Sequence, residues 1–157
     1  MDIKIYTDIA CPFCYIGKKN FEKALAEYET DAKINIEYAS YELDNQAPKV
    51  PEKNMYEVLA EKHDKPMEEI TEMVDHIVEQ GKIAGIEFNM DKVIPANTRD
   101  AHRLLKLAYE FGLGETVLES LHRAYFIDGK NVSDKDVLLE IAKENRMPEV
   151  PALEVIN

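Results

Sequence analysis

Positive charge is scarce in this sequence. Of its 157 residues, 19 are Lys or Arg and 31 are Asp or Glu, so the formal net charge is 19 minus 31, or −12. Proteins that bind phosphate backbones or anionic lipid normally concentrate Lys and Arg on one face. The acidic balance therefore argues against nucleic acid as a ligand.

Long apolar runs are also missing. The longest stretch without Asp, Glu, Lys or Arg covers only residues 9–17, whereas a helix that spans a membrane needs about 20 apolar residues. The first residues, MDIKIYTDIA, contain no basic segment that leads into an apolar run, so they do not resemble a secretory signal. We therefore expect no membrane segment and a cytoplasmic location.

The overall composition is that of a folded globular protein. Apolar residues make up 45% of the chain and charged residues 32%, which is too apolar for a disordered chain. A chain of this length suggests one domain, or one domain with an insertion, and can bury a sizeable core.

The N-terminal part of the sequence predicts a strand, a helix and a second strand. Residues 3–7 (IKIYT) alternate in polarity and are rich in β-branched and aromatic types, as are residues 34–41 (INIEYASY). Between them, residues 13–29 carry apolar side chains at helical spacing. This order predicts a βαβ unit with parallel strands.

After Asp44 the pattern becomes helical. Glycines and capping residues delimit predicted helices near 54–63, 66–84, 98–111, 115–127 and 134–144. A short strand signal follows Pro151. The predicted organisation is a first half over residues 1–44, an inserted helical domain over 45–146 and an incomplete return strand within 147–157.

Cysteine is rare, and its placement is informative. The only two cysteines, Cys11 and Cys14, form the motif CPFC between the first strand and the following helix. Cys11 is then expected at the helix N-terminus, where free backbone N–H groups and the helix dipole favour a thiolate. Pro12 suits the first helical position and helps to hold the two sulfurs together. We predict that Cys11 is the more acidic and more accessible thiol.

The cysteine pair allows three other interpretations. Two inert buried thiols would need no chemistry, and a structural disulfide across four residues would close little loop entropy. A structural zinc site needs about four ligands. No second cysteine pair and no His-x3-5-His pair accompany the motif; the four histidines are His63, His76, His102 and His122. We therefore expect neither a metal nor a cofactor.

Together these features resemble the DsbA family of thioredoxin-like proteins, and most closely its cytoplasmic FrnE-type branch. The resemblance rests on the leading strand, CPFCYIG, the second strand, the helical insertion and the segment IPANTRDAHRLLKLAYEFG, and it covers about residues 3–145. It implies a thioredoxin-like α/β fold with an all-helical insertion. It also implies a thiol–disulfide oxidoreductase in which Cys11 attacks and Cys14 resolves. Members carry a cis-proline that faces the dithiol, and Pro151 is the candidate here.

The sequence departs from the family pattern at two places. DsbA has a His between its cysteines, whereas this chain has Phe13 beside Pro12, so we expect a less oxidising couple. The chain also stops at Asn157, where the family continues with more of the sheet. We therefore expect either a shortened chain or a homodimer in which a second copy completes the sheet.

Four polar residues in the segment IPANTRDAHRLLKLAYEFG are expected to have structural roles only. His102 lies on a predicted helix and is expected to be a packed or capping residue. Asn97, Thr98 and Asp100 are expected to form an N-cap with acidic support in the first turn.

The predicted function is thiol–disulfide exchange on protein disulfides or small disulfides, without a cofactor. The rival hypothesis is a binding or chaperone-like module that keeps the fold and turns nothing over. A kappa-type glutathione-dependent relative is disfavoured, because those proteins typically have Ser at the position of Cys11.

Overall fold

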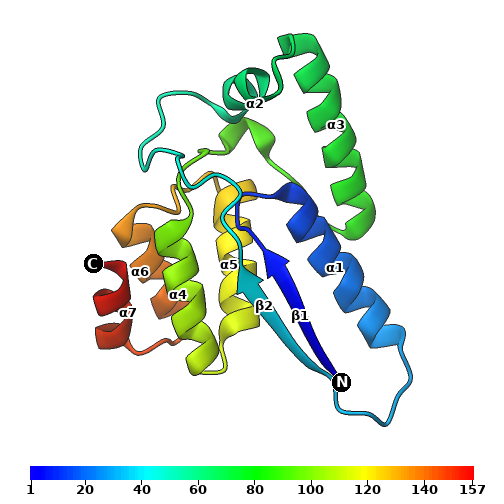
Figure 1. Ribbon diagram of the computed structural model, residues 1–157, viewed down its shortest axis with the longest axis vertical. Helices are drawn as coiled ribbons and strands as arrows, with labels where there is room; N and C mark the ends of the chain where they lie inside the picture. The colour runs from blue at the N-terminus through cyan, green and yellow to red at the C-terminus, as the bar shows by residue number, and fades with distance from the viewer.

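The computed structural model describes residues 1–157 and contains a two-stranded sheet and seven α-helices (Figure 1). The elements are β1 (Asp2–Thr7), α1 (Pro12–Glu27), β2 (Asn35–Ser40), α2 (Met55–His63), α3 (Met67–Ala84), a 3-10 turn (Met90–Lys92), α4 (Arg99–Glu110), α5 (Gly114–Phe126), α6 (Lys135–Glu144) and α7 (Glu149–Ile156). The predicted βαβ unit and the five predicted helices are confirmed, with boundaries that agree within about two residues.

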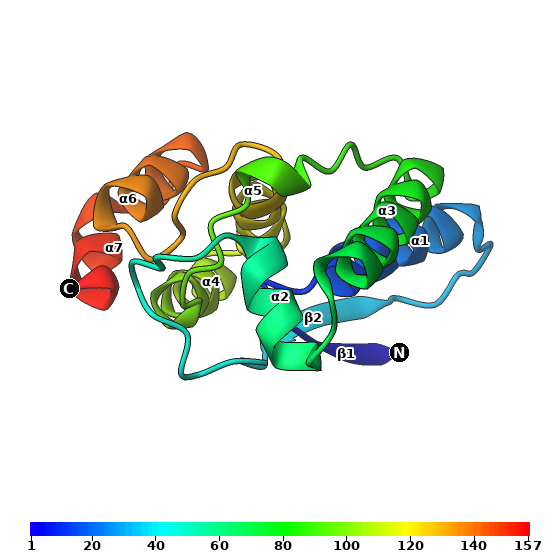
Figure 2. The same ribbon diagram turned by 90° about the horizontal axis from the view of Figure 1, so that it is seen from above.

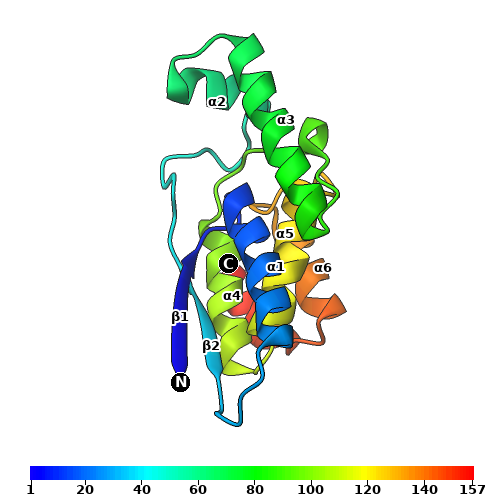
Figure 3. The same cartoon turned by 90° about the vertical axis from the view of Figure 1, so that its right-hand side faces the viewer.

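The two strands are parallel and adjacent. Asp2 lies opposite Asn35 and Thr7 lies opposite Ser40, so both strands end at the same edge of the sheet. The helices gather on one face of this sheet (Figure 3). On the other face, the ring of Tyr6 is 66% exposed.

The helical block packs directly against the sheet. Helices α4 and α5 contact each other and β2, and α1 contacts α3. A single cluster of 29 buried hydrophobic residues joins residues from β2, α1 and the helical block. Helices α6 and α7 lie at one end of the molecule, and α3, beside α1, lies toward the other (Figure 2).

The C-terminal segment corrects one prediction. Residues 147–157 do not form a return strand, because Glu149–Ile156 is the helix α7. Pro151 lies in its first turn, where the missing N–H of proline costs no intrahelical hydrogen bond. Ala152 and Ile156, four residues apart, bury one face of α7, which packs on α4 and α6.

None of the helices is both long enough and apolar enough to span a bilayer.

Candidate functional site

The dithiol lies where β1 gives way to α1. Cys11 is the N-cap residue of α1 and Pro12 occupies the first helical turn. The N–H of Cys14 donates to the carbonyl of Cys11 at 3.2 Å, so both thiols belong to the same turn. Both cysteines are free and half-buried. The position of the pair at the carboxyl end of a parallel strand follows from the βαβ connection.

The two thiols titrate as a pair. A hydrogen bond from the Cys11 thiol lowers the pKa of Cys14 to about 6, assisted by the backbone N–H of Asp8. That same hydrogen bond, followed by burial, raises the pKa of Cys11, although the backbone N–H groups of Cys14 and Phe13 act in the opposite direction. The dithiol therefore gives up its first proton easily and holds the second one tightly.

This distribution differs from the expectation that Cys11 is the more acidic thiol. The interaction between the two thiols lowers the pKa of Cys14 and raises that of Cys11. Transfer of a proton from Cys11 to Cys14 would leave the charge on Cys11, next to the amides of Phe13 and Cys14.

An apolar groove, here called the dithiol groove, opens beside Cys11. Its volume is about 330 Å³, and 15 of its 22 lining residues are hydrophobic. Pro12 and Phe13 line it together with Cys11, opposite side chains of α2 and α3 that include Met55 and Met73. Phe13 is 59% exposed. Cys14 lines a different and smaller hollow of about 240 Å³. Only Cys11 therefore faces the dithiol groove.

A buried carboxylate lies directly behind the dithiol. Asp8 is 2% exposed, and its carboxylate accepts hydrogen bonds from Thr98 Oγ1 at 2.8 Å, His102 Nε2 at 2.9 Å and the N–H of Leu43 at 2.9 Å. Burial alone would raise the pKa of Asp8, but the three hydrogen bonds outweigh it and hold the pKa below its ordinary value. Asp8 is therefore an anion that ties the loop before Cys11 to α4.

A second histidine, His122 of α5, packs against the backbone of Asp8. His122 is fully buried, its ring lies 4.6 Å from that of Tyr15, and Nε2 is 3.3 Å from the carbonyl oxygen of Asp8. A carbonyl oxygen only accepts, so Nε2 carries the proton. Burial lowers the pKa of His122 to about 4. The ring is therefore neutral at physiological pH.

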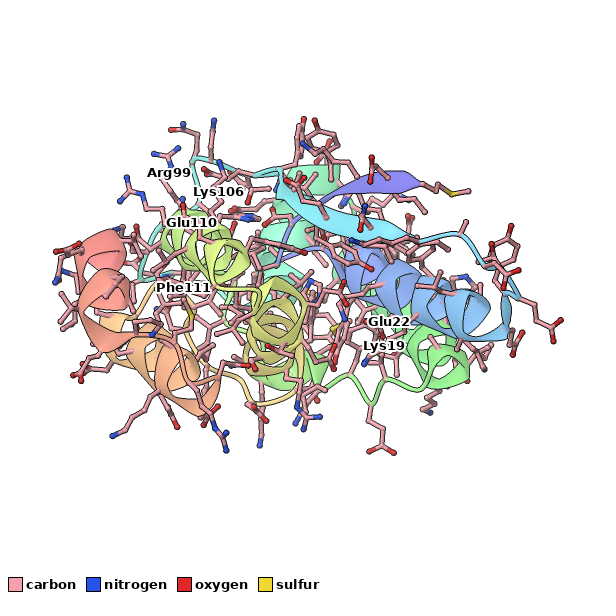
Figure 4. The ribbon with its side chains drawn as sticks, turned by 90° about the horizontal axis from the view of Figure 1, so that it is seen from below. Lys19, Glu22, Arg99, Lys106, Glu110 and Phe111 are labelled. Atoms are coloured by element: carbon pink, nitrogen blue, oxygen red, sulfur yellow. The ribbon has the colours of Figure 1, made fainter.

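Further along α1, a cluster of charges links this helix to α5. Lys18 is buried and forms ion pairs with Glu22 and Glu119, and Lys19 lies 2.9 Å from Glu119. Figure 4 shows Lys19 and Glu22 side by side on α1. Burial opposes ionisation of Glu119, but the hydrogen bond from Lys19 and the charge of Lys18 lower its pKa. These charges are compensated locally and fix α1 against α5.

The structure separates Pro151 from the other predicted site residues. Cys11, Cys14, Pro12 and Phe13 share one turn, whereas α7 lies at the far side of α4 from α1 (Figure 1). The chain contains no cis peptide bond. Pro151 is therefore not a cis-proline that faces the dithiol; as a helical residue it serves the first turn of α7.

Two of the four structural interpretations in the segment IPANTRDAHRLLKLAYEFG need refinement. Asn97 does accept from the N–H of Arg99, and Asp100 lies in the first turn of α4, as expected for helix starts. Thr98, in contrast, makes no capping bond and donates to Asp8. His102 is packed, but its partner is also Asp8.

Asp8 and its partners Thr98, His102 and the N–H of Leu43, here called the Asp8 cluster, were not predicted from the sequence. An acidic residue inside the otherwise uncharged run before CPFC was a weak signal for a buried carboxylate. Its partners lie about 90 positions away, at separations that no local pattern reveals. No group of three His, Cys, Asp or Glu side chains lies close enough to hold a metal ion.

Comparisons with known proteins place this geometry in a family. Residues 2–156 match the family described as DSBA-like thioredoxin domain. The uncharacterized protein YwbO of Bacillus subtilis is 27% identical over 146 residues, which are 90% of this chain and 64% of YwbO. The chain thus spans less than two thirds of that relative.

Solved structures give the same picture. A probable DsbA oxidoreductase from Streptomyces coelicolor has a TM-score of 0.92 and 31% identity, with 99% of this chain and 67% of that chain covered. The cytosolic disulfide reductase DsbM from Pseudomonas aeruginosa, at 16% identity, shares the fold with a TM-score of 0.67 over 99% of this chain and 69% of that one. A thioredoxin-like βαβ core with inserted helices, matched over nearly its whole length, means that this chain belongs to the DSBA-like thioredoxin domain family.

Proposed function

We propose that this chain carries the dithiol of a thiol–disulfide oxidoreductase, with Cys11 as the attacking thiolate and Cys14 as the resolving one. The observation that carries the proposal is the position of Cys11: it caps α1, it receives backbone N–H groups, and it is the cysteine that lines the dithiol groove. The low pKa of Cys14 supports its role as the second nucleophile.

The exchange proceeds in two displacements. The Cys11 thiolate attacks one sulfur of a substrate disulfide, so a Cys11–substrate disulfide forms and the other substrate sulfur leaves as a thiolate. The Cys14 thiolate then attacks the Cys11 sulfur, which releases the second substrate thiolate and forms the Cys11–Cys14 disulfide. The substrate is reduced by two electrons, the dithiol is oxidised, and the two thiol protons end on the products.

The dithiol groove supports a preference among disulfides. Its wall of Met, Leu, Ile and Val side chains favours a disulfide that is flanked by apolar residues in an extended protein segment. Methionines from α2, α3 and the 3-10 turn, Met55, Met73 and Met90, can adapt to side chains of different shape. We also propose that small disulfides are exchanged at lower efficiency, because they fill less of the groove.

The proposal includes a cytoplasmic setting and membership of the FrnE-type branch. DsbM, which shares the fold, is described as a cytosolic disulfide reductase. In a reducing compartment the CPFC pair would rest as a dithiol, which suits reduction or isomerisation of substrates. We also propose a homodimer, which the molar mass from light scattering tests.

The decisive experiment combines turnover with trapping of the intermediate. We expect the chain to reduce the disulfides of insulin with a thiol reductant and to lose that activity in Cys11→Ser. Cys14→Ser should instead accumulate a mixed disulfide through Cys11, visible by non-reducing mass spectrometry. A matched change outside the groove, Ser120→Ala, should leave turnover intact. Trapping through Cys14 in Cys11→Ser, with none through Cys11, would overturn the assignment.

The alternative is a binding or chaperone-like module. The apolar dithiol groove would favour it, since binding of an extended segment needs no chemistry. Suppression of substrate aggregation that is equal in the wild type and in the Cys11→Ser/Cys14→Ser double variant, with no insulin reduction by either, would support this alternative.

A further inference from the structure

A second hollow, here called the α4 pocket, lies between the end of β2 and the first turns of α4. It has a volume of about 460 Å³, and only one of its eight lining residues is hydrophobic. It shares His102 with the Asp8 cluster but contains neither cysteine. Its polarity is opposite to that of the dithiol groove.

Three residues that line the α4 pocket each carry a buried polar atom without a hydrogen-bond partner. Only four buried side-chain atoms in the chain lack a hydrogen-bond partner, and three of them, Ser40 Oγ, Glu42 Oε2 and His102 Nδ1, belong to residues that line this pocket. The His102 side chain is only 5% exposed, and its Nε2 is engaged by Asp8. An unsatisfied buried polar group costs about 1–3 kcal/mol. Three such atoms in residues that line one polar hollow favour a polar ligand there.

Three cationic side chains line the α4 pocket. Arg99, Arg103 and Lys106 lie on one side of α4 at spacings of four and three residues and line the pocket with a single carboxylate, Glu42. Their formal sum is three minus one, or +2, in a chain of net charge −12. Figure 4 shows Arg99 and Lys106 at the edge of α4 that lies away from α5.

The existing ion pairs leave part of this charge free. The Arg99 side chain donates to Glu42 at 3.0 Å, and Arg103 lies 3.4 Å from Asp100, whose closer partner is Lys49 at 2.7 Å. Lys106 makes no ion pair. Its ammonium and most of the Arg103 guanidinium are therefore available to an anion.

We propose that the α4 pocket binds a small oxyanion that also carries an O–H group, of which hydrogen phosphate and phosphate monoesters in their monoanionic form are the simplest class. Lys106 and Arg103 neutralise the charge, Ser40 Oγ donates to one of its oxygens, and Glu42 Oε2 and His102 Nδ1 are the acceptors for its O–H. This assignment uses every unpartnered atom in the pocket. It goes beyond the proposed thiol chemistry and does not depend on it.

The test is a titration of the wild-type chain with inorganic phosphate, followed through the imidazole nitrogens by ¹H–¹⁵N NMR. The His102 Nδ1 signal should shift and saturate. His122 provides an internal control, because its Nδ1 is equally buried and unpartnered but lies outside the α4 pocket. Sodium chloride at matched ionic strength should not reproduce the shift.

Variants then locate the binding. Arg103→Gln and Lys106→Gln remove one exposed cation each and should weaken phosphate binding by about tenfold, the equivalent of one charge-assisted contact. Lys23→Gln on α1 removes an equally exposed cation far from the pocket and should leave affinity unchanged. Neither pocket variant should alter insulin reduction, which separates this site from the dithiol.

Sulfate tests whether the ligand must carry an O–H group. It matches phosphate in shape but carries no proton near neutral pH. Phosphate should bind at least about tenfold more tightly than sulfate, because sulfate leaves Glu42 Oε2 without a donor. A phosphate monoester with a small alkyl group should bind like inorganic phosphate. A shift that fails to saturate, that chloride reproduces, or that is equal for sulfate would overturn the proposal.

Discussion

Asp8 and His102, which are 94 positions apart in the sequence, are joined by a buried hydrogen bond of 2.9 Å between Oδ1 and Nε2. Thr98 Oγ1 donates to the same oxygen at 2.8 Å. These bonds fasten the loop that precedes Cys11 to the start of α4. The position of the dithiol therefore depends on contacts between the first few residues of the chain and the helical block.

Removal of the Thr98 hydroxyl should loosen this attachment. We expect Thr98→Val to lower the free energy of unfolding by about 1–2 kcal/mol, because a buried carboxylate loses one of its donors while the side-chain volume is kept. Urea melts measure the effect. Thr71→Val, on an exposed hydroxyl of α3, is the matched control and should change stability by less than about 0.5 kcal/mol. Equal effects of the two changes would contradict the role of Thr98.

His122 should make stability depend on pH. Its pKa is about 4 in the folded protein, against about 6.5 in an unfolded chain, so between these values the unfolded state binds more protons. Stability is then full above about pH 6.5 and falls as the pH drops toward 4, by about 3 kcal/mol from this group.

The comparison of His122→Phe with wild type isolates this contribution, since the ring stack on Tyr15 is kept. The difference in unfolding free energy between the two proteins should change across pH 7 to 4. His76→Gln, on an exposed histidine of α3, should keep the wild-type pH dependence. A His122→Phe protein with an unaltered pH slope would show that this ring is not buried as a neutral group.

The reduced dithiol should react as a thiolate well below the ordinary thiol pKa. With the pKa of Cys14 at about 6, we expect the pH midpoint for alkylation of the pair near 6 rather than about 8.5. Cys11→Ala should shift the Cys14 midpoint upward, because the S–H donor is lost. In Cys14→Ala the midpoint of Cys11 should stay below about 8.5, because the helix amides remain. A Cys11 midpoint at or above that value would contradict its role as nucleophile.

Phe13 should set the redox equilibrium of the pair. We expect Phe13→His to favour the dithiol form by about tenfold in a glutathione series, equivalent to about 30 mV, since a cation beside the dithiol stabilises its thiolate. Phe13→Leu keeps the site uncharged and should leave the equilibrium near that of wild type. An unchanged potential in Phe13→His would mean that position 13 does not act on the thiolate.

Two helix-interior glycines should respond oppositely to alanine. A Cβ at Gly17 of α1 would meet nothing within 4 Å, so Gly17→Ala should stabilise the chain by about 0.5–1 kcal/mol. A Cβ at Gly81 of α3 would overlap the Phe88 ring, and Gly81→Ala should destabilise by about 1–3 kcal/mol. Thermal melts of both variants give the sign; a stabilising Gly81→Ala would show that Phe88 moves freely.

The sequence by itself determined the local elements and the reactive pair. Period-2 alternation in residues 3–7 and 34–41 placed β1 and β2, and helical spacing in residues 13–29 and from Met55 to Glu144 placed α1 to α6. These patterns are local consequences of backbone geometry. CPFC between a strand and a helix was equally local, which is why Cys11 and Cys14 were found without the structure.

Only the tertiary structure decided the rest. The segment around Pro151 has an apolar pattern that suits a short strand or a helix, and its packing on α4 and α6 selects the helix. The partners of Asp8, the neutral His122 and the three unpartnered atoms of the α4 pocket arise from residues tens of positions apart. Hydrogen bonding and desolvation depend on which side chains meet in three dimensions, and a linear pattern does not contain that information.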